Sequence, residues 1–382
     1  MVKGQDKLHN DGMPDMWLLF LVLLLCGIGL VMLYSSSALY ASRATGQAWG
    51  YVARQSAYLA AGFVAMWLAY RFGYERLPPV VWPALGFCLV LLVMVLVPAL
   101  GTKAGGSQRW LRLGPIGFQP GELAKVVFVV YLAGSLTRKR EQIHSFGRGL
   151  LPHLVVCGLL MALLLAQPDF GSATLLAMVT FFMLFVAGAR MRYLVLSALV
   201  ALPMAYGLMT ASAYRLRRLM AFLDPWSHRF DIGYQVVESM MGFGAGGVTG
   251  TGLGAGHQKL FFLPAAHTDF IFSIVGEELG FVGAFAILAI FGLVVWRGMR
   301  IAYLAQDLFG SYLAFGLSLM LALQVLVNIG VVTGLLPTKG LTLPFFSYGG
   351  SSLLCNLAAV GLLLSISRRP RQLPQQPKIT WP

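Results

Sequence analysis

A single aspartate stands where a long apolar segment begins. Asp269 belongs to the run HTDF, and the sequence after it stays largely apolar as far as Trp296. A carboxylate in this position can cap the N-terminus of a membrane helix. It can also act as a base or an ion-pair partner, because ionisable groups at membrane depth usually line functional cavities. The sequence leaves both uses open for Asp269, and one residue can serve both.

Glu122 and Lys125 form a second charged group in apolar surroundings. They stand three residues apart, so they share one face of a helix. A lysine inside a membrane needs an anionic partner. Glu122 is the local candidate, and Asp269 is the alternative because both helices are expected to begin at the same membrane face. A purely structural ion pair that holds two helices together is the competing interpretation.

Arginines gather in two polar stretches between apolar segments. Arg109 is followed by Trp110 in the first stretch, and Arg215, Arg217 and Arg218 open the second. Guanidinium groups bind phosphate and pyrophosphate bidentately, which indicates a phosphorylated ligand. Contact with anionic lipid headgroups is an equally good explanation from the sequence alone.

Three further carboxylates have more ordinary explanations. Asp169 in AQPDFG follows Pro168, which breaks a helix, so Asp169 is predicted to cap the next one. Glu277 and Glu278 lie roughly 12–13 Å deeper in the membrane than Asp269 at 1.5 Å per residue. They point to different helix faces, and we interpret them as polar contacts between helices.

Two other patterns do not support a cofactor or metal site. Residues 242–256 contain eight glycines and the run GTGLGA, which fits the dinucleotide-binding fingerprint. That fingerprint requires a βαβ unit, which this sequence lacks, so the run is predicted to be a tightly turning loop. His257, His267 and Asp269 lack the helical spacing of metal ligands, and we predict no protein metal site.

The elements that hold these residues are predicted from composition. The chain has 382 residues, of which 58% are hydrophobic and 11% charged, whereas a soluble domain has about 25% charged residues. Many apolar runs reach roughly 18 residues, the length that crosses a bilayer. The four cysteines lie singly in apolar runs, which indicates small buried side chains instead of disulfides or zinc ligands. We predict an all-α polytopic membrane protein.

Ten transmembrane helices are predicted within a domain that spans residues 16–367. A tail of residues 1–15 precedes this domain, and a proline-rich tail of residues 368–382, predicted to be disordered, follows it. Two large loops, 100–121 and 212–267, lie on one face of the membrane. The predicted spans are 16–38, 51–70, 80–99, 122–136, 149–166, 171–189, 193–211, 268–295, 309–335 and 346–366.

The distribution of positive charge predicts the orientation. With both termini inside, the cytoplasmic segments carry 16 of the 28 Lys and Arg residues and the outer segments carry 11, of which five lie in one long loop. This bias favours a cytoplasmic N-terminus and C-terminus. It also accounts for much of the net charge of +14, so a nucleic-acid partner is not needed to explain that charge. The two large loops, and with them the function, are then expected on the outer face.

Several long motifs in order make the chain resemble the SEDS family, the membrane glycosyltransferases of bacterial cell-wall synthesis. The resemblance covers nearly the whole chain, and the residues within the motifs are more similar to the division branch (FtsW) than to the elongation branch (RodA). The matching stretches are SQRWLRLGPIGFQPGELAK (107–125), AQPDFGSA (166–173), YRLRRLMAFLDPW (214–226), GYQVVESMMGFGAGG (233–247), QKLFFLPAAHTDFIFSIVGEELGFVGA (258–284) and LPTKGLTLPFFSYGGSSLL (336–354).

The resemblance implies a fold, an activity and partners. The fold has ten helices and an outward cavity beneath the large loop between helices 7 and 8. Family members polymerise lipid II, an undecaprenyl-pyrophosphate-linked disaccharide-pentapeptide, together with a class B penicillin-binding protein. For the division branch the expected place is the septum of the bacterial cytoplasmic membrane, among membrane lipids and divisome proteins.

The resemblance also assigns residues. The family's essential aspartate is matched by Asp269, the expected catalytic base. The positions expected to bind substrate are Arg109, Trp110, Glu122, Lys125, Arg218, Gln235 and His267. The sequence departs from the family pattern at Gly121, Ala265 and Glu238, which leaves the base in place but affects loop docking and the charge of the cavity.

Two alternatives to a division polymerase follow from the same features. A lipid II flippase would also need a polytopic fold and buried charges, but it would need access from both faces, whereas the charged and aromatic loops gather on one. An elongation polymerase of the RodA type would have the same chemistry. No cofactor is predicted, although a divalent cation could accompany the substrate pyrophosphate.

Overall fold

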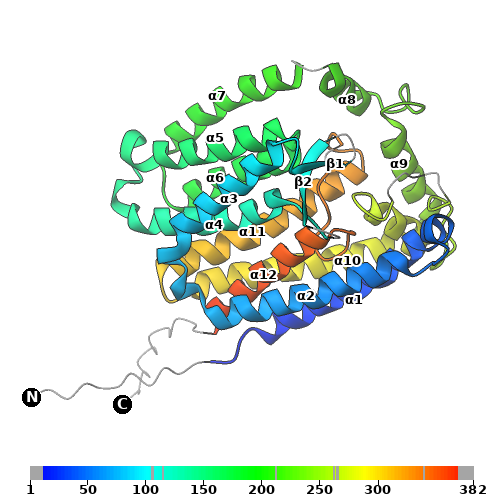
Figure 1. Cartoon of the computed structure of the whole chain (residues 1–382), viewed down its shortest axis with the longest axis horizontal. Coiled ribbons are helices and arrows are strands. Elements are labelled where there is room, and N and C mark those ends of the chain that lie inside the picture. Colours follow the sequence, from blue (N-terminus) through cyan, green and yellow to red (C-terminus); the bar gives the residue numbers. More distant parts are fainter. Residues whose placement is uncertain are drawn as a thin grey trace, which may run out of the picture.

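A bundle of long, roughly aligned helices forms the body of the protein in the computed structural model (Figure 1). The structure describes residues 12–104, 107–113, 116–210, 213–260, 263, 266–338 and 340–368. The long helices are α1 (Met16–Thr45), α2 (Gly50–Phe72), α3 (Val81–Leu96), α4 (Pro120–Arg138), α5 (Leu151–Ala166), α6 (Phe170–Val186), α7 (Met191–Thr210), α10 (Ile271–Leu304), α11 (Leu308–Val332) and α12 (Gly350–Ser367).

Each of the ten predicted spans coincides with one of these helices, which confirms the helical fold. Within the described residues, seven helices are long and apolar enough to cross a membrane, and two shorter apolar segments lie in α6 and α7. The number of crossings stays a prediction. Most of the N-terminal tail and nearly all of the C-terminal tail, residues 1–11 and 369–382, lie outside the described residues.

Short polar signals set where the helices begin. Asp15 accepts a hydrogen bond from the Leu18 amide and caps α1, and Asp307 caps α11 in the same way through Gly310. Pro120 opens α4, where its fixed φ suits the first turn and its missing amide costs nothing. Asp15 also forms an ion pair of 2.6 Å with Arg297 of α10, which ties two helices together at this end.

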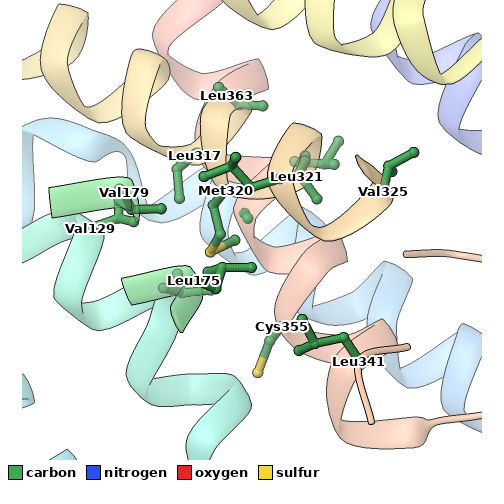
Figure 2. Close-up of a cluster of buried hydrophobic side chains, with 14 of the residues drawn as sticks. Val129, Leu175, Val179, Leu317, Met320, Leu321, Val325, Leu341, Cys355 and Leu363 are labelled. Carbon is green, nitrogen blue, oxygen red and sulfur yellow. The ribbon is translucent and has the colours of Figure 1, made fainter. Parts of the chain in front are cut away.

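The core lies where α4, α6, α11 and α12 meet (Figure 2). Val129, Leu175 and Leu317 from three of these helices are fully buried. Helix α7 stands apart, since it packs weakly against α6 and α8 and presents apolar side chains outward (Figure 1). Apolar exposure of this kind suits contact with lipid acyl chains.

The two predicted outer loops contain regular structure that was not predicted. The first holds a three-stranded antiparallel sheet of β1 (Gly101–Ala104), β2 (Ser107–Leu113) and β3 (Ile116–Phe118). The second holds α8 (Ala213–Leu223) and α9 (Tyr234–Gly246). Gln108 of β2 donates a hydrogen bond of 2.9 Å to the Val95 carbonyl of α3, which fixes the sheet on the bundle. The sheet therefore has a fixed position at the end of α3, and β2 also packs against α4.

The glycine-rich run 242–256 was predicted to be a loop, but residues 242–246 form the end of α9, so the prediction is wrong for that part. The loop that follows Gly246 docks into a break in α10. Gly280 has φ 67° and ψ −169°, so the helix is interrupted there. The backbone groups freed by the break bond to the loop 247–252 instead of to each other, as satisfaction of backbone groups in a membrane demands. Four backbone bonds of 2.9–3.1 Å make the contact: Thr251 N to Glu277 O, Gly252 N to Glu278 O, Phe281 N to Gly247 O and Val282 N to Val248 O.

We expect Gly250→Ala to destabilise the folded protein. Gly250 has φ +82°, and a Cβ there would lie 2.2 Å from the Glu278 carbonyl oxygen. A left-handed alanine alone costs roughly 1–3 kcal/mol, and the clash adds to this. The midpoint of thermal unfolding in detergent should fall clearly below that of the wild type. The matched control is Gly244→Ala in α9, where nothing lies within 4 Å; an equal fall in both variants would contradict the docking.

Candidate active site

Asp269 lies in the turn before α10 and does not cap that helix. The N-cap residue is Phe270, and no side chain caps the helix there, so the capping interpretation of Asp269 is wrong. The backbone carbonyl of Asp269 accepts a hydrogen bond of 2.9 Å from Asn328 of α11, which also donates to the Leu341 carbonyl at 2.8 Å. Asn328 thus fixes the Asp269 backbone, and Asp269 as a whole residue is half-buried.

Arg109 of β2 reaches over the N-terminus of α6. Its Nε donates to the Gln167 carbonyl at 3.4 Å, and its Nη2 donates to the Pro168 carbonyl. Its Nη1 lies 3.8 Å from Asp169, which caps α6 through Ser172 as predicted. Two carbonyls and a carboxylate hold the guanidinium group, so the Arg109 side chain has one defined orientation.

Gly340 shows that Asp269 and Arg109 face each other. A Cβ placed on Gly340 would lie 3.3 Å from Asp269 Oδ2 and 3.4 Å from Arg109 Nη1. Both charged groups therefore border the same small volume beside Gly340, where a Cβ would make tight contacts with both. Residues from the sheet, the start of α10 and the connection from α11 to α12 meet at this point.

Several charges act on the Asp269 carboxyl group. Burial raises the pKa of Asp269 to about 6, against the lowering effect of Arg109. Asp169 and Glu122 also raise this pKa, whereas Arg218 lowers it. A carboxyl group with a pKa near 6 is ionised at neutral pH and is a stronger base than an ordinary aspartate, which suits general-base catalysis.

Lys125 pairs with Glu122 and not with Asp269. Its Nζ lies 2.8 Å from Glu122 Oε1, and both side chains are almost fully buried in α4. Of the two partners predicted for Lys125, the local one is therefore found. The cation that acts most strongly on Asp269 is Arg109.

The remaining predicted residues lie at different distances from Asp269. Arg218 of α8 approaches the Thr338 carbonyl at 3.5 Å, on the connection that carries Gly340. The Trp110 ring packs over Gly117 of β3, where a Cβ would lie 3.4 Å away. Gln235 lies in the first turn of α9 and is half-buried; it is not among the described residues whose charges act on Asp269.

His267, two residues before Asp269, belongs to an aromatic cluster. Its ring lies 4.7 Å from that of Tyr51 and 5.9 Å from that of Tyr348. Burial lowers the pKa of His267, so the ring is neutral at physiological pH. This packing gives His267 a role in positioning the HTDF turn.

Glu278 and Glu277 hold the second outer loop on α10. Glu278 forms a buried ion pair of 2.7 Å with Lys259 and accepts a hydrogen bond from Ser35 of α1, which confirms a contact between helices. The Glu277 side chain instead accepts hydrogen bonds from the backbone amides of His257 and Gln258, so among the described residues its polar contacts are with a loop.

Asp169, Asn328 and Gly340 were not predicted to belong to the site. Only Asp169 carried a usable signal, since it is a carboxylate beside a predicted outer helix end. Of the departures from the family pattern, Gly121 packs near Asp169 Oδ2, where a Cβ would lie 3.6 Å away, and Glu238 is buried in α9. Ala265 lies outside the described residues.

Comparison with known proteins identifies the family. The sequence profile of the cell cycle proteins FtsW, RodA and SpoVE matches residues 16–372. This chain belongs to the FtsW/RodA/SpoVE family. The predicted SEDS membership is thereby confirmed, and with it the placement of this family member in a membrane.

Individual relatives in the FtsW/RodA/SpoVE family match over almost their whole length. The probable peptidoglycan glycosyltransferase FtsW of Geobacter metallireducens is 45% identical over 360 residues, which cover 94% of this chain and 96% of the relative. Stage V sporulation protein E of Bacillus subtilis is 41% identical over 358 residues, which cover 94% and 98%.

Solved structures of the same family share the fold. A chain from a peptidoglycan synthase complex that coordinates polymerization and crosslinking is 33% identical, with a TM-score of 0.78 and coverage of 93% of this chain and 98% of that chain. The rod shape determining protein RodA of Thermus thermophilus is 30% identical, with a TM-score of 0.68 and coverage of 95% and 98%.

Proposed function

We propose that this chain is a peptidoglycan glycosyltransferase that polymerises lipid II into glycan strands during cell division. Relatives at 45% identity bear the name probable peptidoglycan glycosyltransferase FtsW. The observation that carries the proposal is that Asp269 Oδ2 and Arg109 Nη1 border the same space beside Gly340. A base beside a fixed guanidinium suits a reaction in which a hydroxyl attacks and a pyrophosphate leaves.

In this mechanism Asp269 takes the proton from the sugar 4-hydroxyl of the incoming lipid II. The freed oxygen attacks the anomeric carbon of the growing strand on the face opposite the leaving group and forms a β-1,4 bond. The bond between that carbon and the α-linked lipid pyrophosphate breaks, and the pyrophosphate leaves with the electron pair. A positioned base of this kind contributes about 10²–10⁴-fold to the rate.

Arg109 and Arg218 are the cations that would stabilise the departing pyrophosphate. Both lower the pKa of Asp269, so both lie within electrostatic range of the base. Preorganised positive charge stabilises negative charge that develops in the transition state. The buried Glu122–Lys125 pair would stay in place and support the start of α4 beneath the substrate.

The test is polymerisation of purified lipid II by the full chain with its partner, resolved on a gel. Glycan strands that lengthen with time would support the proposal. A protein that moves labelled lipid II across a vesicle membrane but makes no polymer would replace it by the flippase alternative. Comparison with an elongation-specific partner would separate the division and elongation roles.

The polymerisation rate is expected to fall at low pH. Burial raises the pKa of Asp269 to about 6, and the base must be ionised to accept a proton. The rate should be steady above pH 7 and fall about tenfold per pH unit well below pH 6. Single-turnover rates between pH 5 and 8 with fixed partner and detergent check this; a flat profile through pH 6 would contradict the role of Asp269.

The proposed activity also requires protein partners, a membrane orientation and a test for a cation on the substrate. A class B penicillin-binding protein of the FtsI type would crosslink the product, alongside divisome proteins at the septum. Both termini would face the cytoplasm, which places Asp269 and the outer sheet on the opposite side. A divalent cation on the substrate pyrophosphate stays a prediction, to be tested by polymerisation in EDTA with and without added Mg²⁺.

A further inference from the structure

A pocket of about 540 Å³ opens at the end of the bundle away from Asp269. It lies between the start of α3, the end of α4 and the start of α5. Helix α4 has 19 residues, so its last residue, Arg138, stands roughly 27 Å along the helix axis from Pro120. In the proposed orientation this end faces the cytoplasm, and the pocket is separate from the catalytic site.

The mouth of the pocket faces the bilayer. Trp82, Leu151 and Val155 line it and are 52%, 42% and 59% exposed. Large apolar side chains exposed on a membrane-spanning bundle contact acyl chains, so a lipid can enter from the side. Pro152 and Val156 extend this apolar wall along α5.

One end of the pocket is positively charged. Arg138 and Lys139 both line it, and no carboxylate is among the described residues that do. The Arg138 guanidinium lies 6.0 Å from the centre of the Trp82 ring, and its Nε donates to the Gly134 carbonyl. Trp82 in turn packs edge-on against buried Tyr131, with ring centres 5.3 Å apart.

We propose that this pocket binds an anionic glycerophospholipid, with its phosphate on Arg138 and Lys139 and an acyl chain against α5. The order of cations, aromatic rings and apolar wall matches the order of phosphate, interface and hydrocarbon in a lipid. Basic pockets between helices on the cytoplasmic side commonly take such headgroups. A lipid-linked precursor is the poorer fit, because its reacting sugar would lie a membrane thickness away from Asp269.

Native mass spectrometry of the full chain in detergent, titrated with phosphatidylglycerol or phosphatidylcholine, tests this site. The wild type should bind phosphatidylglycerol more tightly than phosphatidylcholine. Arg138→Gln with Lys139→Gln should weaken phosphatidylglycerol binding about 30-fold, since each cation near a lipid phosphate contributes about fivefold. Arg138→Lys with Lys139→Arg keeps the charge and should restore most of the binding.

The matched control is Arg140→Gln with Arg148→Gln, which removes two exposed cations at the same end but outside the pocket. It should change binding by less than about threefold. Val156→Trp, which fills the pocket, should weaken the binding of both lipids. Equal binding of the two lipids by the wild type, or an equal loss in the control, would overturn the proposal. The proposal would also be overturned if the wild type bound undecaprenyl pyrophosphate more tightly than phosphatidylglycerol and the Arg138 and Lys139 double variant lost that binding.

Discussion

Asp269→Asn is expected to reduce glycan polymerisation by about 10²–10⁴-fold. Asparagine has nearly the same shape, and the Asn328 hydrogen bond goes to the Asp269 backbone carbonyl, so the turn should keep its position. The substitution removes the proton acceptor alone. The measurement is the initial rate of gel-resolved polymerisation of lipid II by purified protein with its cognate penicillin-binding protein.

The control for this variant is Asp231→Asn, an exposed carboxylate in the same outer segment. It should polymerise at the wild-type rate. Both variants should elute as the wild type does in size-exclusion chromatography and should bind the partner equally. If folded Asp269→Asn polymerises at the wild-type rate, the base must be another group, and the proposed mechanism fails.

Arg109→Gln is expected to reduce polymerisation by about 10²–10³-fold, as loss of one preorganised charge-stabilising donor commonly does. It should also move the acidic limb of the pH–rate profile to higher pH. The reason is that Arg109 lowers the pKa of Asp269, so without this cation the carboxyl group holds its proton to a higher pH. The shift distinguishes an electrostatic role from a loss of folding.

Arg112→Gln is the matched control, because Arg112 lies on the same strand but is exposed. It should leave both the rate and the pH profile unchanged. Arg109→Lys should recover part of the rate, since a lysine keeps the charge but cannot donate to the Gln167 and Pro168 carbonyls with the same planar geometry. If Arg109→Gln lowers the rate but leaves the acidic limb of the pH–rate profile unchanged, Arg109 does not act on the pKa of Asp269, and this part of the proposal fails.

The helical body could be predicted because each helix has a local signal. Long apolar runs, Pro120 at a helix start and Asp169 as a cap all act through the sequence around them. The Glu122–Lys125 pair could be predicted for the same reason, since the two residues share one helix face. Local spacing therefore identified the elements and several charged residues.

The assembly of the site could not be predicted, because it depends on residues far apart in the chain. Arg109 meets Asp169 across 60 positions, and Gly340 matters only because of what a Cβ there would touch. The sheet 101–118 lacks the apolar alternation of a typical strand, so tertiary contacts such as that of Gln108 decide its form. The capping interpretation of Asp269 failed because the helix begins at Ile271, one residue later than a cap at Asp269 would require.

The interruption at Gly280 gives the two parts of α10 separate supports. The part after the break is tied to the start of α1 by the Arg297–Asp15 pair, while the part before it ends on Glu277 and Glu278, whose side chains bond to the His257 amide and to Lys259. Only a short rod, residues 271–279, separates this junction from Asp269. A protein that displaced the loop 247–252 would thus disturb both parts of α10 at once, because the loop forms backbone hydrogen bonds on each side of the break.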